Sequence, residues 1–489
     1  MSYCGYITNL MNVREHGNAD NLVLATCFEN TVCVAKDKYF EGQLGVYFPV
    51  DGQLSMEFCE KNGLLAVYDE FGKNISGGYL DPAKRNVRAI KLRGEQSDGL
   101  FLPIECLAYT GAKLDDLTPG TPITVLNGHE ICKKYIPRGK NKGNGVKHHA
   151  GQKLKRKNMA PTFFEHKDTE QLVYHLNEFK PGDYIEITRK LHGTSGRTAF
   201  VQSFDGHSYT TNNIFHKFLG KILPAAKAQK FAEKHCTPVF DYDIVTGTRR
   251  TILDSFDGGF YGSNEFRKQY HDFFKGKLWK GETIYYEIVG FTHDGTPIMS
   301  TCSNEKLKDK AFVKQYGKVT TFSYGCDPKG VAVAGVADPS NPDTAFSASK
   351  PQSDIYVYRM TMTNEDGQVV EYTPDFMRYR CMYMGVKTVP VHWAGFIPDE
   401  EVFTGTSCEL TDAGQFVLEK AEKFFDGPEP IDPTHIREGV VVRIINRPTF
   451  TAYKHKNFNF KVIEGIIKDV AEAPDMEEAD GLGDGEVSE

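Results

Sequence analysis

One lysine of this sequence stands where it could act as a nucleophile. The segment Tyr184–Arg197 reads YIEITRKLHGTSGR, and strand alternation would place Glu186, Thr188 and Lys190 on one face before the chain breaks at Gly193. A lysine at a strand end, followed by a turn of small polar residues, suits a covalent nucleophile whose attacking amine is neutral. Taken alone, this pattern is more often an ordinary exit from a strand into a turn.

Further residues suited to phosphate chemistry follow in order along the chain. An aromatic-rich strand (GETIYYEIVG) carries Glu287, a second (DIYVYRM) contains Tyr358, Glu438 precedes an apolar VVV run, and Lys454 and Lys456 share one face of an extended segment. Each piece has an ordinary structural explanation. Together they supply what nucleotidyl transfer needs, because it uses a lysine nucleophile, acids for a hard divalent cation, an aromatic plane for a base and cations for a triphosphate.

These motifs, in one order over about residues 180–465, resemble those of the covalent nucleotidyltransferase superfamily of polynucleotide ligases and mRNA-capping enzymes. The run Lys190–Thr194 (KLHGT) matches the lysine motif KxDG in the KxHG form that is common in RNA ligases. The resemblance implies an ATP-dependent RNA ligase that joins 3′-hydroxyl and 5′-phosphate RNA ends through a lysine-AMP intermediate and an RNA-adenylate, in RNA repair.

The resemblance also implies roles for the residues that carry the chemistry. Lys190 would take the AMP, His192 would stand where many members have Asp, and Lys454 with Lys456 would contact the phosphates. The implied cofactors are ATP and Mg²⁺ or Mn²⁺.

Two acids and an aromatic residue would complete the core of the site. Glu287 would lie near the ribose or the metal, and Glu438 would hold the metal or its waters. Tyr358 would stack on adenine, with Tyr356 as the alternative, although Arg359 stands where many ligases have an acid. The other nucleotide-binding candidates are Glu186, Thr188, Arg197 and Arg249, and Arg250 is nearly as good a match as Arg249.

The elements that must position these residues fall into two parts. From Tyr6 to about Cys132, short β-rich runs separated by Gly, Asp and Asn predict a small barrel, and residues 87–103 resemble a stretch of tRNA-binding OB domains. We therefore expect an α+β protein with an OB-type β-barrel followed by a ligase-type nucleotidyltransferase domain of ATP-grasp-like antiparallel sheets with flanking helices. The expected bounds are 1–137 for the OB-like domain, 138–160 for a basic linker, 161–468 for the nucleotidyltransferase domain and 469–489 for an acidic disordered tail.

Periodicity predicts the main elements of the second part. The expected helices are Glu170–Glu178, Phe215–Lys234 (more than one) and Ser263–Phe274, and the expected strands are Tyr184–Arg189, Thr283–Val289, Ile355–Met362 and Val440–Ile445. The segment between Gly290 and Ile355 is expected to be a surface insertion, and no chemistry is assigned to it.

Charge is distributed unevenly along the chain. The net charge is −7, yet residues 138–157 carry eight Lys or Arg and no acid, whereas residues 469–489 carry nine acids and no base. A solvated linker and a solubilising tail would explain both segments. In the ligase interpretation the barrel and the linker grip the RNA backbone, which is expected to be a nicked duplex. The expected RNA-binding residues are Lys91, Arg93, Arg250, Lys153, Lys155 and Arg156.

Composition and spacing narrow the other possibilities. The eleven cysteines are never spaced as CxxC, so we expect reduced thiols and no zinc site, and no apolar run or basic leader predicts membrane insertion or secretion. A monomer without a membrane partner is expected in the cytoplasm, or in the host-cell cytoplasm if a virus encodes it. Only 33 residues follow Lys456, so we expect no OB domain there. This argues against a capping-type guanylyltransferase or a DNA ligase, and a catalytically decayed RNA-binding protein is a further alternative.

Overall fold

The computed structural model of this chain describes residues 3–28, 30–50, 52–70, 74–88, 90–93, 95–135, 159–167, 169–253, 255–258, 261–330, 350–399 and 413–464. Most of the expected basic linker and the whole acidic tail lie outside these residues. Lys153, Lys155 and Arg156 of the predicted RNA contacts therefore lie outside the described residues, as does the side chain of Lys91.

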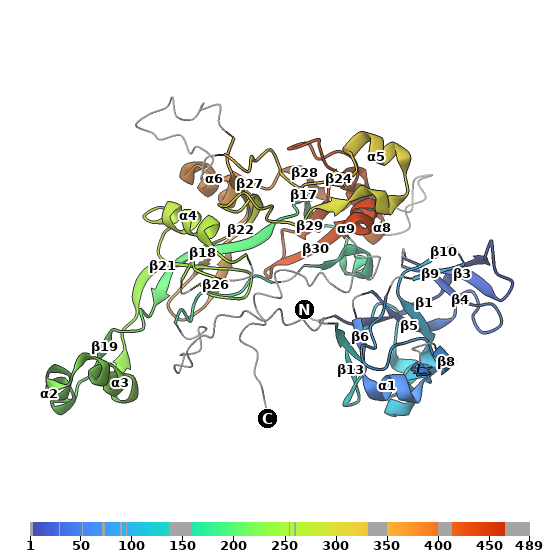
Figure 1. Cartoon of the computed structure of the whole chain (residues 1–489), viewed down its shortest axis with the longest axis horizontal. Helices are drawn as coiled ribbons and strands as arrows, with labels where there is room; N and C mark the ends of the chain where they lie inside the picture. The colour runs from blue at the N-terminus through green and yellow to red at the C-terminus, as the bar shows by residue number, and fades with distance from the viewer. Residues whose placement is uncertain are drawn as a thin grey trace.

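Residues 3–135 form a β-rich unit beside a larger unit formed by the rest of the described chain (Figure 1). Its strands are β1 (Gly5–Asn9), β2 (Met11–Glu15), β3 (Leu22–Cys27), β4 (Asn30–Ala35), β5 (Leu44–Phe48), β6 (Gly52–Leu54), β7 (Ala66–Tyr68), β8 (Asn74–Gly77), β9 (Ile90–Leu92), β10 (Glu95–Ser97), β11 (Leu100–Pro103), β12 (Pro122–Ile123), β13 (Val125–Leu126), β14 (His129–Glu130) and β15 (Cys132–Lys134). Its helical elements are α1 (Met56–Lys61) and the 3₁₀ turns η1 (Ile104–Thr110) and η2 (Leu114–Asp116).

Strand pairing joins this unit into several sheets. The order β11-β5-β1-β12 makes one sheet and β2-β3-β4 a second, with two-stranded ribbons around them. Alternating side chains such as Ile7, Val46 and Phe48 are fully buried in its core. Helix α1 is an addition to the predicted strands, and it begins where the Ser55 side chain accepts a hydrogen bond from the backbone N–H of Phe58. The OB assignment stays a prediction.

The larger unit contains the remaining elements. Its strands are β16 (Glu170–Gln171), β17 (Tyr184–Lys190), β18 (Thr194–Ser203), β19 (Tyr209–Thr210), β20 (Thr237–Pro238), β21 (Asp241–Gly247), β22 (Glu282–Gly290), β23 (Cys302–Ser303), β24 (Val319–Thr320), β25 (Ser353–Thr363), β26 (Val369–Glu371), β27 (Lys387–Thr388), β28 (Val391–Phe396), β29 (Gly439–Ile444) and β30 (Thr451–Lys456). Its helices are α2 (Ile214–Ile222), α3 (Ala225–His235), α4 (Glu265–Phe274), α5 (Lys310–Tyr316), α6 (Pro374–Met384), α8 (Ala413–Phe425) and α9 (Phe458–Glu464), with 3₁₀ turns η4 (Leu172–Tyr174), η5 (Leu176–Glu178) and η6 (Asn304–Leu307).

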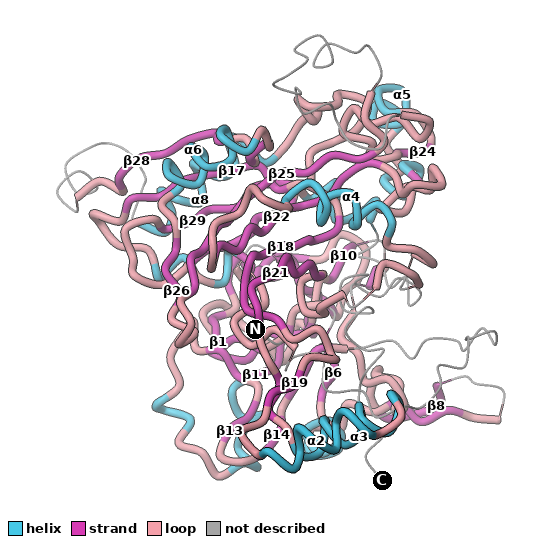
Figure 2. The backbone as a smooth tube through the Cα atoms, turned by 90° about the vertical axis from the view of Figure 1, so that its left-hand side faces the viewer, coloured by secondary structure: helices cyan, strands magenta, loops and turns pink. Residues whose placement is uncertain are grey.

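Two mainly antiparallel sheets organise this unit. One has the order β16-β30-β29-β17-β28, and the other has the order β21-β18-β22-β25-β26 with β27 added beside β25. Figure 2 shows β21, β18, β22 and β25 running side by side, with β17, β29 and β28 beyond them. Because β17 continues through a short turn into β18, the lysine at the end of β17 lies where the chain passes from one sheet to the other.

Helices cover these sheets and complete their cores. Helices α4 and α6 bury residues such as Phe274 and Met377 against Ile288 of β22 and Val357 of β25. Helix α8 buries side chains against β17 and β29 in the same way. The helical pair α2–α3 projects away from the sheets, and in Figure 1 it and the N-terminal unit extend from the same side of the larger unit.

The expected α+β class is confirmed, and most predicted elements appear within a residue or two. The predicted helix over Glu170–Glu178 is wrong, because that stretch forms β16 and the turns η4 and η5. Glu170 pairs with Tyr453 in a parallel strand, and the ring of His175 contacts both Glu170 and Glu178. These tertiary contacts override a helical pattern that is only two turns long.

Two compositional expectations can be compared with the structure. No disulfide joins the cysteines of the described part of the chain. Within the same described residues, no helix is both long and apolar enough to cross a membrane.

Candidate active site

The strand β17 delivers Lys190 to the end of its sheet. From Ile185 to Lys190, β17 pairs with β29, and the last pair joins Lys190 to Gly439. The chain then turns through Leu191–Gly193 into β18. Gly193 is required in this turn, because a Cβ there would lie 2.3 Å from the carbonyl oxygen of Ile288. The turn therefore packs directly against β22.

A buried carboxylate holds the lysine. The Nζ of Lys190 lies 2.8 Å from Oε1 of Glu438, and the Nζ of Lys456 lies 3.1 Å from the same oxygen. The strand register explains this meeting, because Gly439 pairs with Lys190 on one side and with Lys456 on the other. A Cβ at Gly439 would lie 2.1 Å from the carbonyl oxygen of His455, so only glycine allows the strands to approach this closely.

Charge and burial set the ionisation of this cluster. Glu438 is 1% exposed, whereas the side chain of Lys190 is 23% exposed. Burial alone would raise the pKa of Glu438, but Lys190, Lys456 and His192 outweigh it and lower that pKa to about 2. Glu438 is therefore ionised at neutral pH. Its second oxygen, Oε2, is buried and has no hydrogen-bond partner among the described residues.

The second carboxylate oxygen of Glu438 could bind a cation. Among the described residues no group of three or more His, Cys, Asp or Glu side chains is arranged to hold a metal ion. A hard divalent cation nevertheless needs only one or two carboxylates when substrate phosphates complete its shell. The orphaned carboxylate oxygen of Glu438 is such a donor, and Glu287 lies on β22 opposite Ser195, two residues beyond the Gly193 turn.

The second lysine of the cluster sits between two acids. Lys456 contacts Glu438 on one side and Oε2 of Glu464, at 3.1 Å, on the other. Burial works to lower the pKa of Lys456, but the two carboxylates outweigh it and raise the pKa above its usual range. Lys454 precedes it by two residues on the same strand, paired in register with Val441 and Gln171. Lys456 is thus a permanent cation beside the nucleophile.

His192 is packed tightly behind the lysine. Its imidazole is 6% exposed, stands edge-on to the rings of Phe322 and Phe460 at 4.6 and 4.9 Å, and places Nδ1 3.8 Å from Glu464. Burial lowers the pKa of His192, with Glu464 opposing the shift, so the imidazole is neutral at pH 7. Its backbone N–H donates to the hydroxyl of Tyr324 at 2.7 Å.

The predicted aromatic position coincides with an irregularity of β25. Tyr285 pairs with Arg359 but Tyr286 pairs with Val357, so Tyr358 is the extra residue of a β-bulge. Bulges re-aim side chains and are frequent beside active sites. The ring of Tyr358 lies 5.0 Å from that of His166, centroid to centroid, and its hydroxyl is 3.4 Å from Oγ of Ser195.

The alternative aromatic residue is more deeply buried than Tyr358. Tyr356 is 5% exposed and belongs to the hydrophobic cluster that includes Val289 and Val389, whereas Tyr358 packs against the same cluster and is partly buried. Arg359 forms an ion pair with Glu371 and lies over the ring of Tyr285, 4.6 Å from its centroid. The arginine that follows Tyr358 in the sequence is thus paired with an acid, Glu371.

The remaining nucleotide-binding candidates are engaged by the protein itself. Glu186 forms an ion pair with Arg378 at 2.9 Å, and the hydroxyl of Thr188 donates to the carbonyl oxygen of Val441 at 3.3 Å. Arg197 is buried, and it donates to backbone carbonyl oxygens of Thr248 and Phe163 at 2.8 and 3.0 Å.

Two further candidates follow β21, and one lies in the N-terminal unit. Arg249 and Arg250 occupy the tight loop after β21, where Arg249 is half-buried and Arg250 is exposed. Arg93 is exposed in the hairpin between β9 and β10. The structure thus brings Lys190, His192, Glu438 and Lys456 into one cluster. Arg93 and Arg250, the predicted RNA-binding residues whose side chains are described, lie on other loops.

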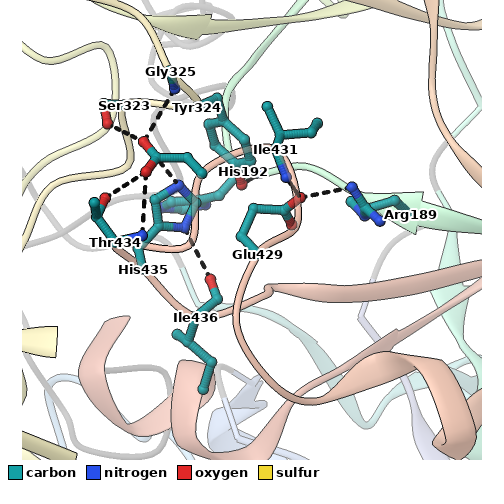
Figure 3. Close-up of polar contacts among 11 residues, drawn as sticks. Arg189, His192, Ser323, Tyr324, Gly325, Glu429, Ile431, Thr434, His435 and Ile436 are labelled. Carbon is teal, nitrogen blue, oxygen red and sulfur yellow. Dashed lines mark hydrogen bonds and ion pairs between the residues drawn. The ribbon is translucent and has the colours of Figure 1, made fainter. Parts of the chain in front are cut away.

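Sequence reasoning missed three residues that touch this cluster or its flanks. They are Glu464 on α9, Tyr324 from the segment to which no chemistry was assigned, and Glu429 from the loop before β29. Figure 3 shows Tyr324 and Glu429 among the polar contacts around Arg189 and His192. No local motif marks them: Tyr324 and Glu429 are 132 and 240 residues from the residues that they contact, and Glu464 follows Lys456 by eight residues in a helix with no distinctive pattern.

Comparisons with known proteins give matches only among solved structures. No protein-family model and no curated protein matches the chain. A mutant of Naegleria gruberi RNA ligase with AMP and Mn matches at 15% identity and a TM-score of 0.48, covering 93% of this chain and 96% of that chain. Naegleria gruberi RNA ligase with PPi matches at 15% identity and a TM-score of 0.48, covering 94% of this chain and 97% of that chain. Neither similarity is high enough to assign an activity.

Proposed function

We propose that this chain is an ATP-dependent RNA ligase that joins a 3′-hydroxyl end to a 5′-phosphate end through AMP carried on Lys190. The observation that carries the proposal is the contact of Lys190 and Lys456 with one buried oxygen of Glu438. An ordinary surface ion pair would not bury a carboxylate between two lysines and leave its second oxygen without a hydrogen bond. A lysine nucleophile, a phosphate-binding cation and a metal-binding acid explain all three features.

The reaction would run in three displacements at phosphorus. In the first, Nζ of Lys190 in its neutral form attacks the α-phosphorus of ATP, an N–P bond forms, and the bond to pyrophosphate breaks. In the second, an oxygen of the RNA 5′-phosphate attacks the same phosphorus and releases the lysine. In the third, the RNA 3′-hydroxyl attacks the 5′-phosphate, loses its proton and expels AMP. Lys456, always charged, would stabilise the negative charge that develops on the phosphates.

Glu438 and Glu287 would hold Mg²⁺ or Mn²⁺ together with the phosphates. When bound, the metal would neutralise part of the negative charge of the phosphates. Oε2 of Glu438 is the protein atom best suited to meet it, because it is buried, ionised and without a hydrogen-bond partner among the described residues.

The nucleotide would lie beyond Lys190, with its base against Tyr358. The bulge at Tyr358 and its partial exposure support this assignment over Tyr356, which is buried in the cluster against which Tyr358 packs. Arg249 and Lys454 would complete the contacts to ribose and phosphates. For Glu186, Thr188 and Arg197 the existing protein contacts favour support of the site over direct contact with the nucleotide.

RNA would be held by the N-terminal unit and the segment that follows it. We assign an OB-type barrel to the N-terminal unit on its short strands and on the basic hairpin that carries Lys91 and Arg93. The basic run at 138–157 would add contacts to the phosphate backbone of a nicked duplex, and Arg250 would add another. We further propose that the chain works as a monomer in the cytoplasm.

The test is transfer of a labelled α-phosphate to the protein. We expect incubation with α-labelled ATP and Mg²⁺ or Mn²⁺ to leave label on the denatured protein, and Lys190→Ala to leave none. Lys180→Ala, which removes an exposed lysine shortly before β17, is the matched control and should be labelled like the wild type. Labelled GTP runs alongside, because preferential labelling by GTP would favour a guanylyltransferase. Label that survives in Lys190→Ala, or no label with either metal, would contradict the proposal.

A further inference from the structure

The backbone on the N-terminal side of Lys190 is anchored by a buried ion pair. Neighbouring residues of a strand point to opposite faces, so Arg189 points away from Lys190. Its Nη1 donates to Oε1 of Glu429 at 2.7 Å. Both side chains are buried, at 7% and 0% exposure. The backbone N–H of Arg189 also donates to the carbonyl oxygen of Pro390 at 2.9 Å. The residue that precedes the nucleophile is therefore fixed both through its side chain and through its backbone.

The backbone on the C-terminal side of Lys190 is anchored by a buried hydroxyl. The N–H of His192 donates to the Tyr324 hydroxyl at 2.7 Å, and Tyr324 is 3% exposed. Burial, together with the neighbouring carboxylates of Glu438 and Glu429, raises the pKa of Tyr324 far above its usual range. The hydroxyl therefore keeps its proton, and its oxygen accepts the His192 N–H at every working pH.

One loop supports both anchors. Glu429 lies in the loop between α8 and β29, where Asp432 accepts hydrogen bonds from the Ser323 hydroxyl and from the Gly325 N–H, the residues on either side of Tyr324. The N–H of Asp432 donates to the carbonyl oxygen of Glu429 at 3.1 Å, so the two acids form one compact turn. Figure 3 shows this turn between Arg189 and Tyr324. The same loop leads directly into Glu438.

We propose that Tyr324 and Glu429 are positioning residues that clamp the backbone on both sides of Lys190 and so fix its amine for attack on the α-phosphate. The inference rests on the proposed function. A lysine at a strand end beside a glycine turn would otherwise be free to shift, and a displacement of about 1 Å at a reacting group costs about 100-fold in rate. The clamp also couples the nucleophile to Glu438, because the loop that carries Glu429 carries that carboxylate next.

The experiment measures a single turnover of labelled lysyl-AMP formation at increasing ATP concentrations. The variants Tyr324→Phe and Glu429→Gln each remove one anchoring interaction and keep the size of the side chain. We expect the rate at saturating ATP to fall about 10- to 100-fold, because the amine is misplaced. We expect the ATP concentration for half-saturation to stay within about threefold, because neither residue is assigned to contact ATP.

Two control variants remove equivalent interactions far from the lysine. Tyr47→Phe removes a buried hydroxyl that donates to the carbonyl oxygen of Asp98 at 2.8 Å, and Glu282→Gln weakens the buried ion pair with Arg380. Thermal melting of all four variants measures the general loss of stability. We expect the controls to melt earlier, like the clamp variants, yet to keep a labelling rate within about twofold of the wild type.

Each outcome decides the matter. If the wild type is labelled and Tyr324→Phe is labelled at the same rate, the clamp is overturned and the proposed function stands. An equal loss of rate in the controls would have the same meaning. If Glu429→Gln fails to fold, Tyr324→Phe, which keeps the ring in its packing, decides by itself. No label on the wild type would overturn the proposed function and the clamp with it.

Discussion

Lys190 and Lys456 share a single carboxylate oxygen of Glu438, at 2.8 and 3.1 Å. Glu464 contacts Lys456 from its far side, so two lysines and two acids are joined in one network. A triphosphate entering beside Lys190 would bring its negative charge to the lysine side of this network. The arrangement makes Glu438 the residue whose removal disturbs the site most.

We expect Glu438→Gln to lower the rate of lysyl-AMP formation about 100- to 1,000-fold while the protein still folds. The amide keeps the shape of the side chain but loses the charge that orders Lys190 and would attract the metal. Glu464→Gln is the matched control, because it removes a charge from Lys456 without touching Lys190. Its rate should fall less. Full activity in Glu438→Gln would mean that this carboxylate is structural.

The pH dependence of stability offers a second test of Glu438. Its pKa in the folded protein is about 2 and lies below the ordinary value of 4.5, so the unfolded chain takes up a proton first as the pH falls. The stabilisation is therefore fully present above about pH 4.5 and is lost as the pH falls towards 2. The shift corresponds to about 3 kcal/mol at neutral pH.

The measurement compares denaturant unfolding of the wild type and Glu438→Gln between pH 7 and pH 3. We expect the wild type to be more stable at pH 7, and the difference in unfolding free energy to shrink as the pH falls below 4.5. A difference that stays constant across this range would show that the carboxylate is not held ionised by the two lysines.

Substitutions of Tyr358 and of Tyr356 should differ in their effect on ATP binding. We expect Tyr358→Ala to raise the ATP concentration for half-saturation about 10-fold, since stacking on a base contributes about 1–3 kcal/mol. Tyr358→Phe, which keeps the ring, should change it little. Tyr356→Leu, which removes the ring and keeps an apolar side chain, should leave it unchanged, because Tyr356 is buried in a hydrophobic cluster. Titration of ATP in the labelling reaction measures all three, and the reverse pattern would move the base to Tyr356.

Much of the fold around the lysine could be predicted from the sequence, because the signal there is local. The alternation of β17 and the aromatic runs of β22 and β25 are strong strand patterns. The segment Glu170–Glu178 was not predictable in this way. Its conformation depends on Tyr453, which is nearly 300 residues away and pairs with Glu170.

Some residues of the site could likewise be predicted from the sequence and others could not. Lys190, Glu438 and Lys456 were predicted from ordered motifs, and the register of β17, β29 and β30 brings them together. Tyr324 and Glu429 carry no motif, since one contributes a hydroxyl to a backbone N–H and the other pairs with an arginine beside the nucleophile. Such contacts depend on how distant segments of the chain fold back on the site, and local sequence patterns do not indicate them.

The basic run at 138–157 gives a prediction about RNA that depends on charge alone. The triple variant Lys153→Gln, Lys155→Gln and Arg156→Gln keeps the length of this segment and removes three positive charges. If each charge neutralises one RNA phosphate, the slope of log affinity against log salt should become shallower by about 2 to 3, because each phosphate contact contributes about 0.7–0.9. Labelling of Lys190 by ATP should not change, since this step needs no RNA.

A control must separate local contacts from the overall charge of the protein. The variant Lys310→Gln, Lys314→Gln and Lys318→Gln removes the same charge from three exposed lysines in and after α5. If the charges act only through long-range attraction, both triple variants should lose RNA affinity equally. Such attraction is screened beyond about 10 Å at 0.1 M salt. A shallower slope only in the first variant would identify residues 153–156 as phosphate contacts. Equal slopes in both would leave the segment as a tether between the two units.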